Sequence, residues 1–226
     1  MTIAIAADLR PLLYARRRHG SIELTLDGVS TLGHLLGSVG LPLTEVGDLR
    51  VDGERVEASW IPLAGTAVEV TARRRPQSGS RFLLDVHLGT LARRMRLLGI
   101  DTAWSNDASD GDLLARAAAE QRVLLTRDRG LLLRRAARDA AYVRGNRPDE
   151  QLDDVIERFA PALMPWSRCL SCNGRLAPVD KATVLERLQP GTRRTYDIFA
   201  RCTACGSLYW RGAHASRLEQ VVDRFR

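Results

Sequence analysis

The chain has 226 residues, of which 45% are hydrophobic and 27% are charged. That balance is typical of a folded globular protein and excludes a disordered chain. No apolar run approaches the roughly 20 residues needed to cross a bilayer, and the first residues lack the basic start of a signal peptide. We therefore expect a cytoplasmic protein with no membrane partner.

The net charge of +7 is unevenly distributed along the chain. Residues 1–80 carry nine Arg against nine Asp and Glu, and residues 81–165 carry fourteen against thirteen. Residues 166–226 carry ten Arg and one Lys against five acids, a net charge of +6. Such an excess indicates contact with a polyanion, and nucleic acid is the simplest choice. Because all but one of the cations are Arg, biased codon usage is an alternative explanation.

Residues 1–72 predict a small mixed α/β unit. Asp27 and Gly28 form a turn signal between β-prone segments, and the apolar residues of segment 32–39 recur at helical spacing. The strands are expected at residues 2–6, 22–26, 49–51 and 67–71. This ββαββ order resembles the β-grasp, ubiquitin-like fold, whose sulfur-carrier members end in a free diglycine tail. The chain has no such tail, so we expect a binding or positioning module, with a protein as its possible partner.

Residues 73–80 contain three Arg, a Pro and Ser-Gly-Ser, a composition that marks a linker. The central domain, residues 81–163, then alternates strand-like and helix-like segments. Strands are expected at residues 82–84, 102–104, 123–126 and 141–143, and helices at 90–98, 110–121, 131–138 and from 149 onward. This alternation predicts a parallel sheet covered by helices.

Two of these strands run into an aspartate, Asp85 and Asp128. If the strands are parallel neighbours, both carboxylates lie at the carboxyl edge of the sheet, where open α/β folds bind their ligands. Asp110, at the start of a predicted helix, is the natural third member. Carboxylates that converge in this way suit Mg²⁺ or Mn²⁺. Each also has a structural alternative, since Asp85 could be a turn residue and the other two could cap helices.

All four cysteines fall in the last segment as two Cys-x-x-Cys pairs, Cys169 with Cys172 and Cys202 with Cys205. Two such pairs complete a tetrahedral sulfur site for zinc, and four protein ligands leave no open position. Disulfides do not fit a cytoplasmic protein, and the spacing is less typical of an iron–sulfur centre. We therefore expect a structural zinc ribbon over residues 164–226 that folds largely through its metal.

The predicted ribbon combines its positive charge with Trp166, Tyr196, Tyr209 and Trp210. Arginines beside aromatic side chains favour RNA binding through phosphate contacts and base stacking. The arginines expected to contact RNA are Arg168, Arg201 and Arg211 in the ribbon, and Arg93 and Arg127 in the central domain. With four cysteines available, we expect His214 to have a structural or substrate-side role.

Residues 82–99, 109–120 and 122–129, together with the cysteine pairs and the segment 209–214, resemble the Mut-seven C-terminal RNase family. That family is a branch of PIN-like nucleases with an appended zinc ribbon, and some members carry a ubiquitin-like domain in front. The resemblance implies a PIN-like α/β fold, a parallel sheet with helices on both faces, and metal-dependent phosphodiester cleavage. Many PIN domains have another acid shortly after the position of Asp128, where this chain has Arg129 and Gly130, so the number of catalytic metal ions stays open.

Within the family pattern, Asp85 matches the first acid, Asp110 the acid that opens the middle helix, and Asp128 the acid after the third strand. We therefore predict an RNA endonuclease that uses Mg²⁺ or Mn²⁺ for catalysis and zinc for structure. The alternative is a non-catalytic RNA- or ribosome-binding adaptor in which the three aspartates are structural. Metal-stimulated cleavage of RNA distinguishes the two.

Overall fold

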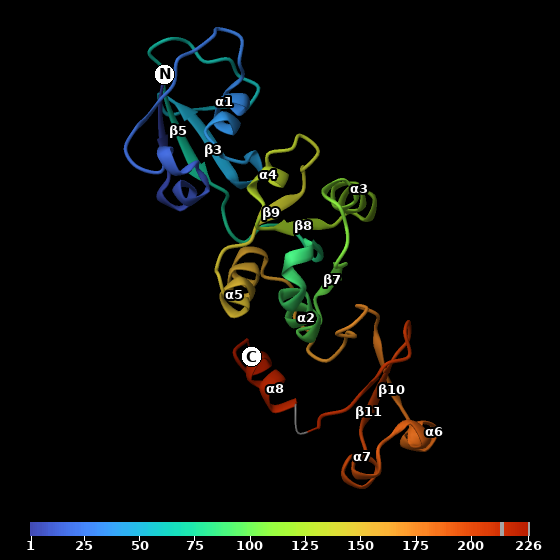
Figure 1. Ribbon diagram of the computed structural model, residues 1–226. Helices are drawn as coiled ribbons and strands as arrows, with labels where there is room; N and C mark the ends of the chain where they lie inside the picture. The colour runs from blue at the N-terminus through green and yellow to red at the C-terminus, as the bar shows by residue number, and fades with distance from the viewer. Residues whose placement is uncertain (213–214, 226) are drawn as a thin grey trace.

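The computed structural model describes residues 1–212 and 215–225 and arranges them as three successive units (Figure 1). The N-terminal unit lies at one end, the central domain in the middle and the cysteine-containing unit at the other end. His214 lies outside the described residues. No helix within the described part of the chain has the length and apolarity needed to cross a membrane.

The N-terminal unit is a five-stranded sheet with one helix packed on it. Its elements are β1 (Thr2–Ile5), β2 (Ile22–Glu23), α1 (Leu32–Ser38), β3 (Val46–Val51), β4 (Glu54–Val56) and β5 (Ala67–Ala72), with 3-10 helices at Ala7–Leu12, Ala15–Arg17 and Leu43–Glu45. The strand order is β2-β1-β5-β3-β4, and β1 and β5 pair in parallel. Alternate residues such as Ile3 and Val68 bury their side chains with those of α1, including Leu36. The predicted ubiquitin-like domain is confirmed.

The central domain is a four-stranded sheet in the order β7-β6-β8-β9, with every pairing parallel. Its strands are β6 (Arg81–Leu84), β7 (Asp101–Trp104), β8 (Val123–Thr126) and β9 (Ala140–Tyr142). Its helices are α2 (Gly89–Leu97), α3 (Asp110–Glu120), α4 (Arg129–Leu132) and α5 (Pro148–Phe159), and a 3-10 turn lies at Val86–Leu88. Phe82 and Leu84 pack with residues of α2 and α5, whereas Leu83 packs with residues of α3 and α4. The predicted parallel sheet with helices on both faces is confirmed.

Two local details differ from the sequence predictions. Helix α2 spans Gly89–Leu97, one residue earlier at each end than the expected 90–98. The helix expected at residues 131–138 is the single turn α4, which begins after its N-cap Asp128. Residues 134–136 are exposed and supply no buried face, so packing does not extend the helix.

The C-terminal unit is a three-stranded antiparallel sheet in the order β10-β11-β12. Its elements are β10 (Leu176–Val179), α6 (Lys181–Val184), α7 (Pro190–Thr195), β11 (Phe199–Cys202) and β12 (Leu208–Tyr209), with a 3-10 helix at Leu185–Arg187. The last helix, α8 (Ala215–Asp223), returns to the central domain, where Val222 is buried in the core beside α2 and α5 (Figure 1). Segment 164–226 therefore supplies both a ribbon and one helix of the central core.

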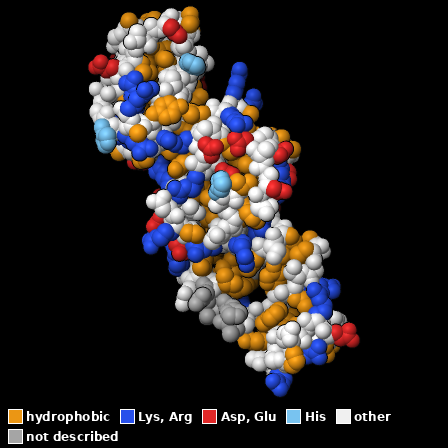
Figure 2. Space-filling model, in the orientation of Figure 1, with side chains coloured by type: hydrophobic (Ala, Val, Ile, Leu, Met, Phe, Trp, Pro, Cys, Tyr) orange, Lys and Arg blue, Asp and Glu red, His pale blue; other side chains and the backbone are white. Residues whose placement is uncertain are grey.

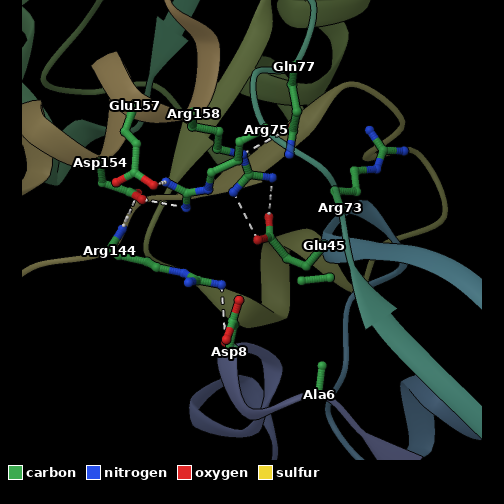
Figure 3. Close-up of a pocket in the computed structure, with 11 residues that line it drawn as sticks. Ala6, Asp8, Glu45, Arg73, Arg75, Gln77, Arg144, Asp154, Glu157 and Arg158 are labelled. Carbon is green, nitrogen blue, oxygen red and sulfur yellow. Dashed lines mark hydrogen bonds and ion pairs between the residues drawn. The ribbon is translucent and has the colours of Figure 1, made fainter.

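The N-terminal and central units are joined by a buried ion pair (Figure 3). Arg158 donates from both terminal nitrogens to Glu45 at 2.9 Å, and these side chains are only 3% and 2% exposed. Glu45 Oε1 also accepts from the backbone N–H of Tyr142, the last residue of β9, at 2.8 Å. The linker is held as well, because Arg73 N donates to the Glu45 carbonyl at 3.0 Å and Gln77 N donates to the Arg158 carbonyl at 2.7 Å.

Further contacts place the N-terminal unit beside the carboxyl ends of the central strands. Arg129, which directly follows Asp128, donates to the carbonyls of Leu12 and Leu13 at 2.9 Å each. Arg144, just beyond β9, donates to the Asp8 carbonyl at 3.1 Å. The ubiquitin-like domain therefore flanks the edge of the sheet where the acids lie.

Candidate active site and metal centre

Asp85 stands at the end of β6 with its side chain only 7% exposed. Its Oδ2 accepts a hydrogen bond from the hydroxyl of Thr126, the last residue of β8, at 2.5 Å. The same hydroxyl oxygen accepts from the backbone N–H of Asp128 at 2.9 Å. Thr126 therefore ties the two acid-bearing segments together, a role that depends on the pairing of β6 with β8.

Asp128 has the structural role that the sequence left open. Its Oδ1 accepts from the backbone N–H of Gly130 at 2.7 Å and caps α4. Its Oδ2 has no hydrogen-bond partner among the described residues. One carboxylate can thus begin a helix and still present an oxygen to a ligand.

Asp110 occupies the first position of α3 but does not cap it. Ser109 and Asp112 form the capping box, as the sequence suggested for this stretch. Asp110 Oδ2 instead pairs with Arg134 Nη2 at 2.7 Å, and both side chains are exposed. The start of α3 is capped without Asp110. The Asp110 carboxylate is therefore free to interact with charged groups at the edge, as it does with Arg134.

The three aspartates do not converge as a ready-made three-ligand site. Within the described residues, the four cysteines form the one group of three or more Cys, His or acidic side chains whose ligand atoms lie within 4.8 Å of one another. Mg²⁺ keeps several waters and is commonly bound by only one or two carboxylates. Two carboxylates at this edge, those of Asp85 and Asp128, are enough in number for a site of that kind.

Among the predicted RNA contacts, Arg93 on α2 is exposed and without a partner in the described part of the chain. Arg127 lies at the acidic edge and donates to Asn146 Oδ1 at 3.0 Å. Arg201 and Arg211 are exposed on the ribbon, and the Arg211 guanidinium lies 5.6 Å from the centre of the Trp166 ring. All five predicted arginines have exposed or half-buried side chains, and four of them make no contact that docks the ribbon.

Arg168 is engaged differently from the other four. Its three side-chain nitrogens contact the Gly99 carbonyl at 3.2 Å, the Asn173 carbonyl at 3.0 Å and the Asp101 carboxylate at 3.3 Å. These contacts use the whole guanidinium at the junction of ribbon and central domain. We therefore assign Arg168 to the docking of the ribbon and not to RNA binding.

The four cysteine sulfurs form a compact cluster whose members all lie within 4.8 Å of one another. Metal–sulfur bonds of about 2.3 Å in a tetrahedron separate the sulfurs by about 3.8 Å. Cys169 and Cys205 lie 3.7 Å apart, and Cys172 and Cys202 lie 3.4 Å apart, so the cluster fits such an ion. The set is consistent with zinc, and four thiolates leave no position for substrate.

Neighbouring hydroxyls support anionic sulfur in this cluster. The Tyr209 hydroxyl lies 3.0 Å from Cys169 Sγ, and the Ser207 hydroxyl lies 3.1 Å from Cys205 Sγ. The hydrogen bond from Ser207 lowers the pKa of Cys205 to about 6. Burial acts in the opposite direction on Cys172 and raises its pKa to about 12. Thiolate is the form that binds metal, so the hydroxyl contacts favour it at Cys169 and Cys205.

Arg96 connects the cysteine cluster to the central sheet. Helical spacing places Arg93, Arg94 and Arg96 away from the apolar face of α2, where exposure is expected, but Arg96 is only 2% exposed. Its Nη1 donates to the carbonyls of Leu170 and Ser171, between the first two cysteines, at 3.0 and 2.8 Å. The expectation failed for Arg96 because the ribbon covers this end of the helix, and burial lowers the pKa of Arg96.

Asp101, at the start of β7, is the second anchor of the ribbon. Its Oδ1 accepts from Arg122 at 2.7 Å and from the Asn173 amide at 2.8 Å. Burial alone would raise the pKa of Asp101, but the hydrogen bonds from Arg122 and Asn173 outweigh it and lower the pKa. The carboxylate is therefore charged at neutral pH, and its contribution to stability is lost only as the pH falls through the folded-state value.

We expect Asp101→Asn to lower the free energy of unfolding by about 1–3 kcal/mol, because charged hydrogen bonds to Arg122 and Arg168 weaken. Urea unfolding of the metal-loaded chain at pH 7 measures this. Asp139→Asn is the matched control, since Asp139 is an exposed aspartate that immediately precedes β9. Equal stability of the two variants would show that Asp101 does not anchor the ribbon.

These anchors place the ribbon opposite the acids. Asp101 precedes the body of β7, at the amino edge of the sheet, whereas Asp85 and Asp128 lie at the carboxyl edge. Strands of four residues separate the two edges by about 13 Å. The cysteine cluster therefore does not take part in chemistry at the acidic edge.

Together, the fold and the cysteine cluster define an α/β domain with an attached metal-binding module, preceded by a ubiquitin-like domain. The family described as "Mut7-C RNAse domain" matches residues 80–222, and that described as "Mut7-C ubiquitin" matches residues 1–78. The chain therefore belongs to the Mut7-C RNAse family, and its central part is a nuclease-type enzyme domain. Comparison with curated proteins and with solved structures gave no match.

Proposed function

We propose that this protein is a metal-dependent ribonuclease that cleaves RNA internally at the carboxyl edge of the central sheet. The link from Asp85 through Thr126 to Asp128 carries the proposal, because it joins the carboxylate of Asp85 to the backbone of Asp128 in a domain of an RNase family. Strand ends of this kind are where open α/β sheets place their ligands.

The hydrogen bonds at this edge divide the carboxylate oxygens into two sets. Asp85 Oδ2 is held by Thr126 and Asp128 Oδ1 by Gly130, so one oxygen of each carboxylate faces no partner among the described residues. These two oxygens would hold Mg²⁺ or Mn²⁺, with Asp110 contributing through the surrounding water. A divalent cation there supplies an activated water for in-line attack and offsets charge on the phosphate.

In this proposal, the arginines bind substrate at two places. Arg93 and Arg127 belong to the central domain, whereas Arg201 and Arg211 lie on the ribbon beyond the amino edge. A strand of RNA that reaches both must cross a sheet about 13 Å deep, which takes at least about four nucleotides at 3.4 Å each. We therefore propose single-stranded RNA of this length or more as the substrate.

The proposal is tested by cleavage of a labelled single-stranded RNA in the presence of Mn²⁺. Asp85→Asn is expected to lower the rate at least about 100-fold, since even groups that only support a metal ligand contribute 10–100-fold. Asp139→Asn, at the opposite edge of the same sheet, should cleave like the wild type. Equal rates for wild type and Asp85→Asn would remove Asp85 from the mechanism.

The adaptor reading makes the opposite prediction in the same assay. A wild-type chain that binds RNA with a steep salt dependence but shows no Mn²⁺-stimulated cleavage would identify an adaptor. The aspartates would then serve as the turn and cap residues described above.

A further inference from the structure

Most arginines of the central domain are already engaged. Of the fourteen in residues 81–165, eleven have a hydrogen-bond or ion-pair partner among the described residues. Arg93, Arg135 and Arg138 have none. Two of these three fall in the short segment 134–138 after α4, so the uncompensated charge of the domain is concentrated there.

That segment forms one wall of a cleft of about 370 Å³, and helix α1 of the ubiquitin-like domain contributes the other. Arg73, Arg134, Arg135 and Arg138 line the cleft, and none of the described residues that line it is acidic. Figure 2 shows blue side chains projecting over the segment that follows α4, beside red side chains of the central domain. The volume is within the range of about 300–1,000 Å³ usual for ligand sites.

A second cavity at the same domain junction has equal numbers of basic and acidic side chains in its lining. It measures about 510 Å³, and its four arginines face four acids, Asp8, Glu45, Asp154 and Glu157. Arg73 borders both cavities, but its guanidinium points away from the Glu45–Arg158 pair in Figure 3. The cleft beside α4 differs in that no acid among the described residues lines it and that Arg135 and Arg138 have no counter-charge there, as an anion site requires.

Thr44 supplies an independent indication that the cleft takes a polar ligand. Its side chain is only 5% exposed and lines the cleft, yet its hydroxyl has no hydrogen-bond partner among the described residues. Buried hydroxyls are nearly always paired, and leaving one unpaired costs about 1–3 kcal/mol. The hydroxyl is closed off from the cleft itself, so a phosphate oxygen would accept its hydrogen after a small shift of the cleft wall.

One end of the cleft is also close to the acidic edge. Arg134 lines it and pairs with Asp110 at 2.7 Å, so one side chain connects the two places. Arg129, five residues earlier, follows Asp128 and fixes the ubiquitin-like domain against this edge. The cleft therefore lies nearer to the acids than the ribbon does, because the ribbon is docked at the amino edge of the sheet.

We propose that this arginine cleft, between α1 and the segment after α4, binds phosphate groups of the RNA strand next to the cleavage position. The choice of RNA as the source of the phosphate rests on the proposed function. The ubiquitin-like domain then completes the substrate site by forming one wall of it.

The test is the affinity of the full chain, with zinc bound and no Mg²⁺ or Mn²⁺ added, for a fluorescent single-stranded RNA. Arg135→Gln with Arg138→Gln should weaken binding roughly tenfold and reduce the salt slope by about 1.4, since each phosphate contact in single strands contributes about 0.7. Arg16→Gln with Arg55→Gln removes the same charge from exposed positions outside the cleft and should have little effect. Equal losses in both double variants would overturn the proposal.

Thr44→Val separates ligand binding from folding. Removing an unpaired buried hydroxyl should leave the melting temperature unchanged or raise it, while RNA affinity falls several-fold. A lower melting temperature with unchanged RNA affinity would give Thr44 a purely structural role and count against the cleft. Loss of inorganic phosphate binding in the Arg135/Arg138 variant with unchanged RNA affinity would also overturn the proposal.

The outcome is independent of the cleavage assay. A wild type that does not cleave RNA while the Arg135/Arg138 variant loses RNA binding would end the nuclease proposal and keep the cleft. If the wild type cleaves RNA and the Arg135/Arg138 variant binds RNA normally, the cleft proposal is overturned and the nuclease proposal is kept.

Discussion

Cys202→Ser is expected to abolish zinc binding and unfold the ribbon. The core of the ribbon consists of little more than Val184, Leu188 and Phe199, which is too small to fold residues 166–212 alone. In zinc fingers, the metal supplies about 10–16 kcal/mol of apparent binding free energy that is also folding free energy. Zinc content per chain and susceptibility of the ribbon to protease measure the effect.

Thr203→Ala is the matched control, because Thr203 lies in the same Cys-x-x-Cys turn and is exposed. It should retain about one zinc per chain, the content expected for a four-thiolate site. A wild-type chain with much less zinc, or a Cys202→Ser chain that keeps its metal, would contradict the assignment.

Glu45→Gln is expected to destabilise the whole chain by about 3–5 kcal/mol, because it leaves the buried Arg158 without a counter-charge. Thermal or urea unfolding of the full chain measures this. Glu157→Gln is the control: Glu157 pairs with Arg75 at 3.4 Å and is 73% exposed, so its removal should change stability by less than about 1 kcal/mol.

Replacing both Glu45 and Arg158 separates two contributions to stability. One is the penalty of a single unpaired charge, and the other is the net free energy that the ion pair supplies. Glu45→Leu with Arg158→Met should recover a large part of the loss, since buried pairs replaced by apolar groups are often neutral. The Tyr142 N–H and Gln77 would still lose their partners. A double variant as unstable as Glu45→Gln would mean that the pair itself is strongly stabilising.

Features that depend on chain pattern were accessible from the sequence. The two cysteine pairs, the strand-end positions of Asp85 and Asp128 and the alternation of strands and helices all follow from local spacing. The role of Thr126 could not be predicted from the sequence. Its hydroxyl contacts a side chain 41 residues away, and the pairing of β6 with β8 brings the two together.

Contacts between residues far apart in the sequence also explain the incorrect expectation for Arg96 and the unpredicted arginine cleft. Arg96 follows the helical pattern of an exposed residue, and only the docked ribbon 74 residues later buries it. Counting charges along the chain gave residues 81–165 almost no net charge and assigned RNA binding mainly to the ribbon. In space, ion pairs consume most of that charge, and two of the three arginines without a partner among the described residues, Arg135 and Arg138, line the cleft beside α1.

The buried Glu45–Arg158 pair also bears on how this protein could be recombined. The first family match ends at residue 78 and the second begins at residue 80, so this position is the obvious place to join segments from two relatives. A chimaera that takes its ubiquitin-like half from one relative and its RNase half from another would need a compatible pair at positions 45 and 158. Without it, a charge with no counter-charge would be buried between the two domains, so we expect these two positions to change together or not at all.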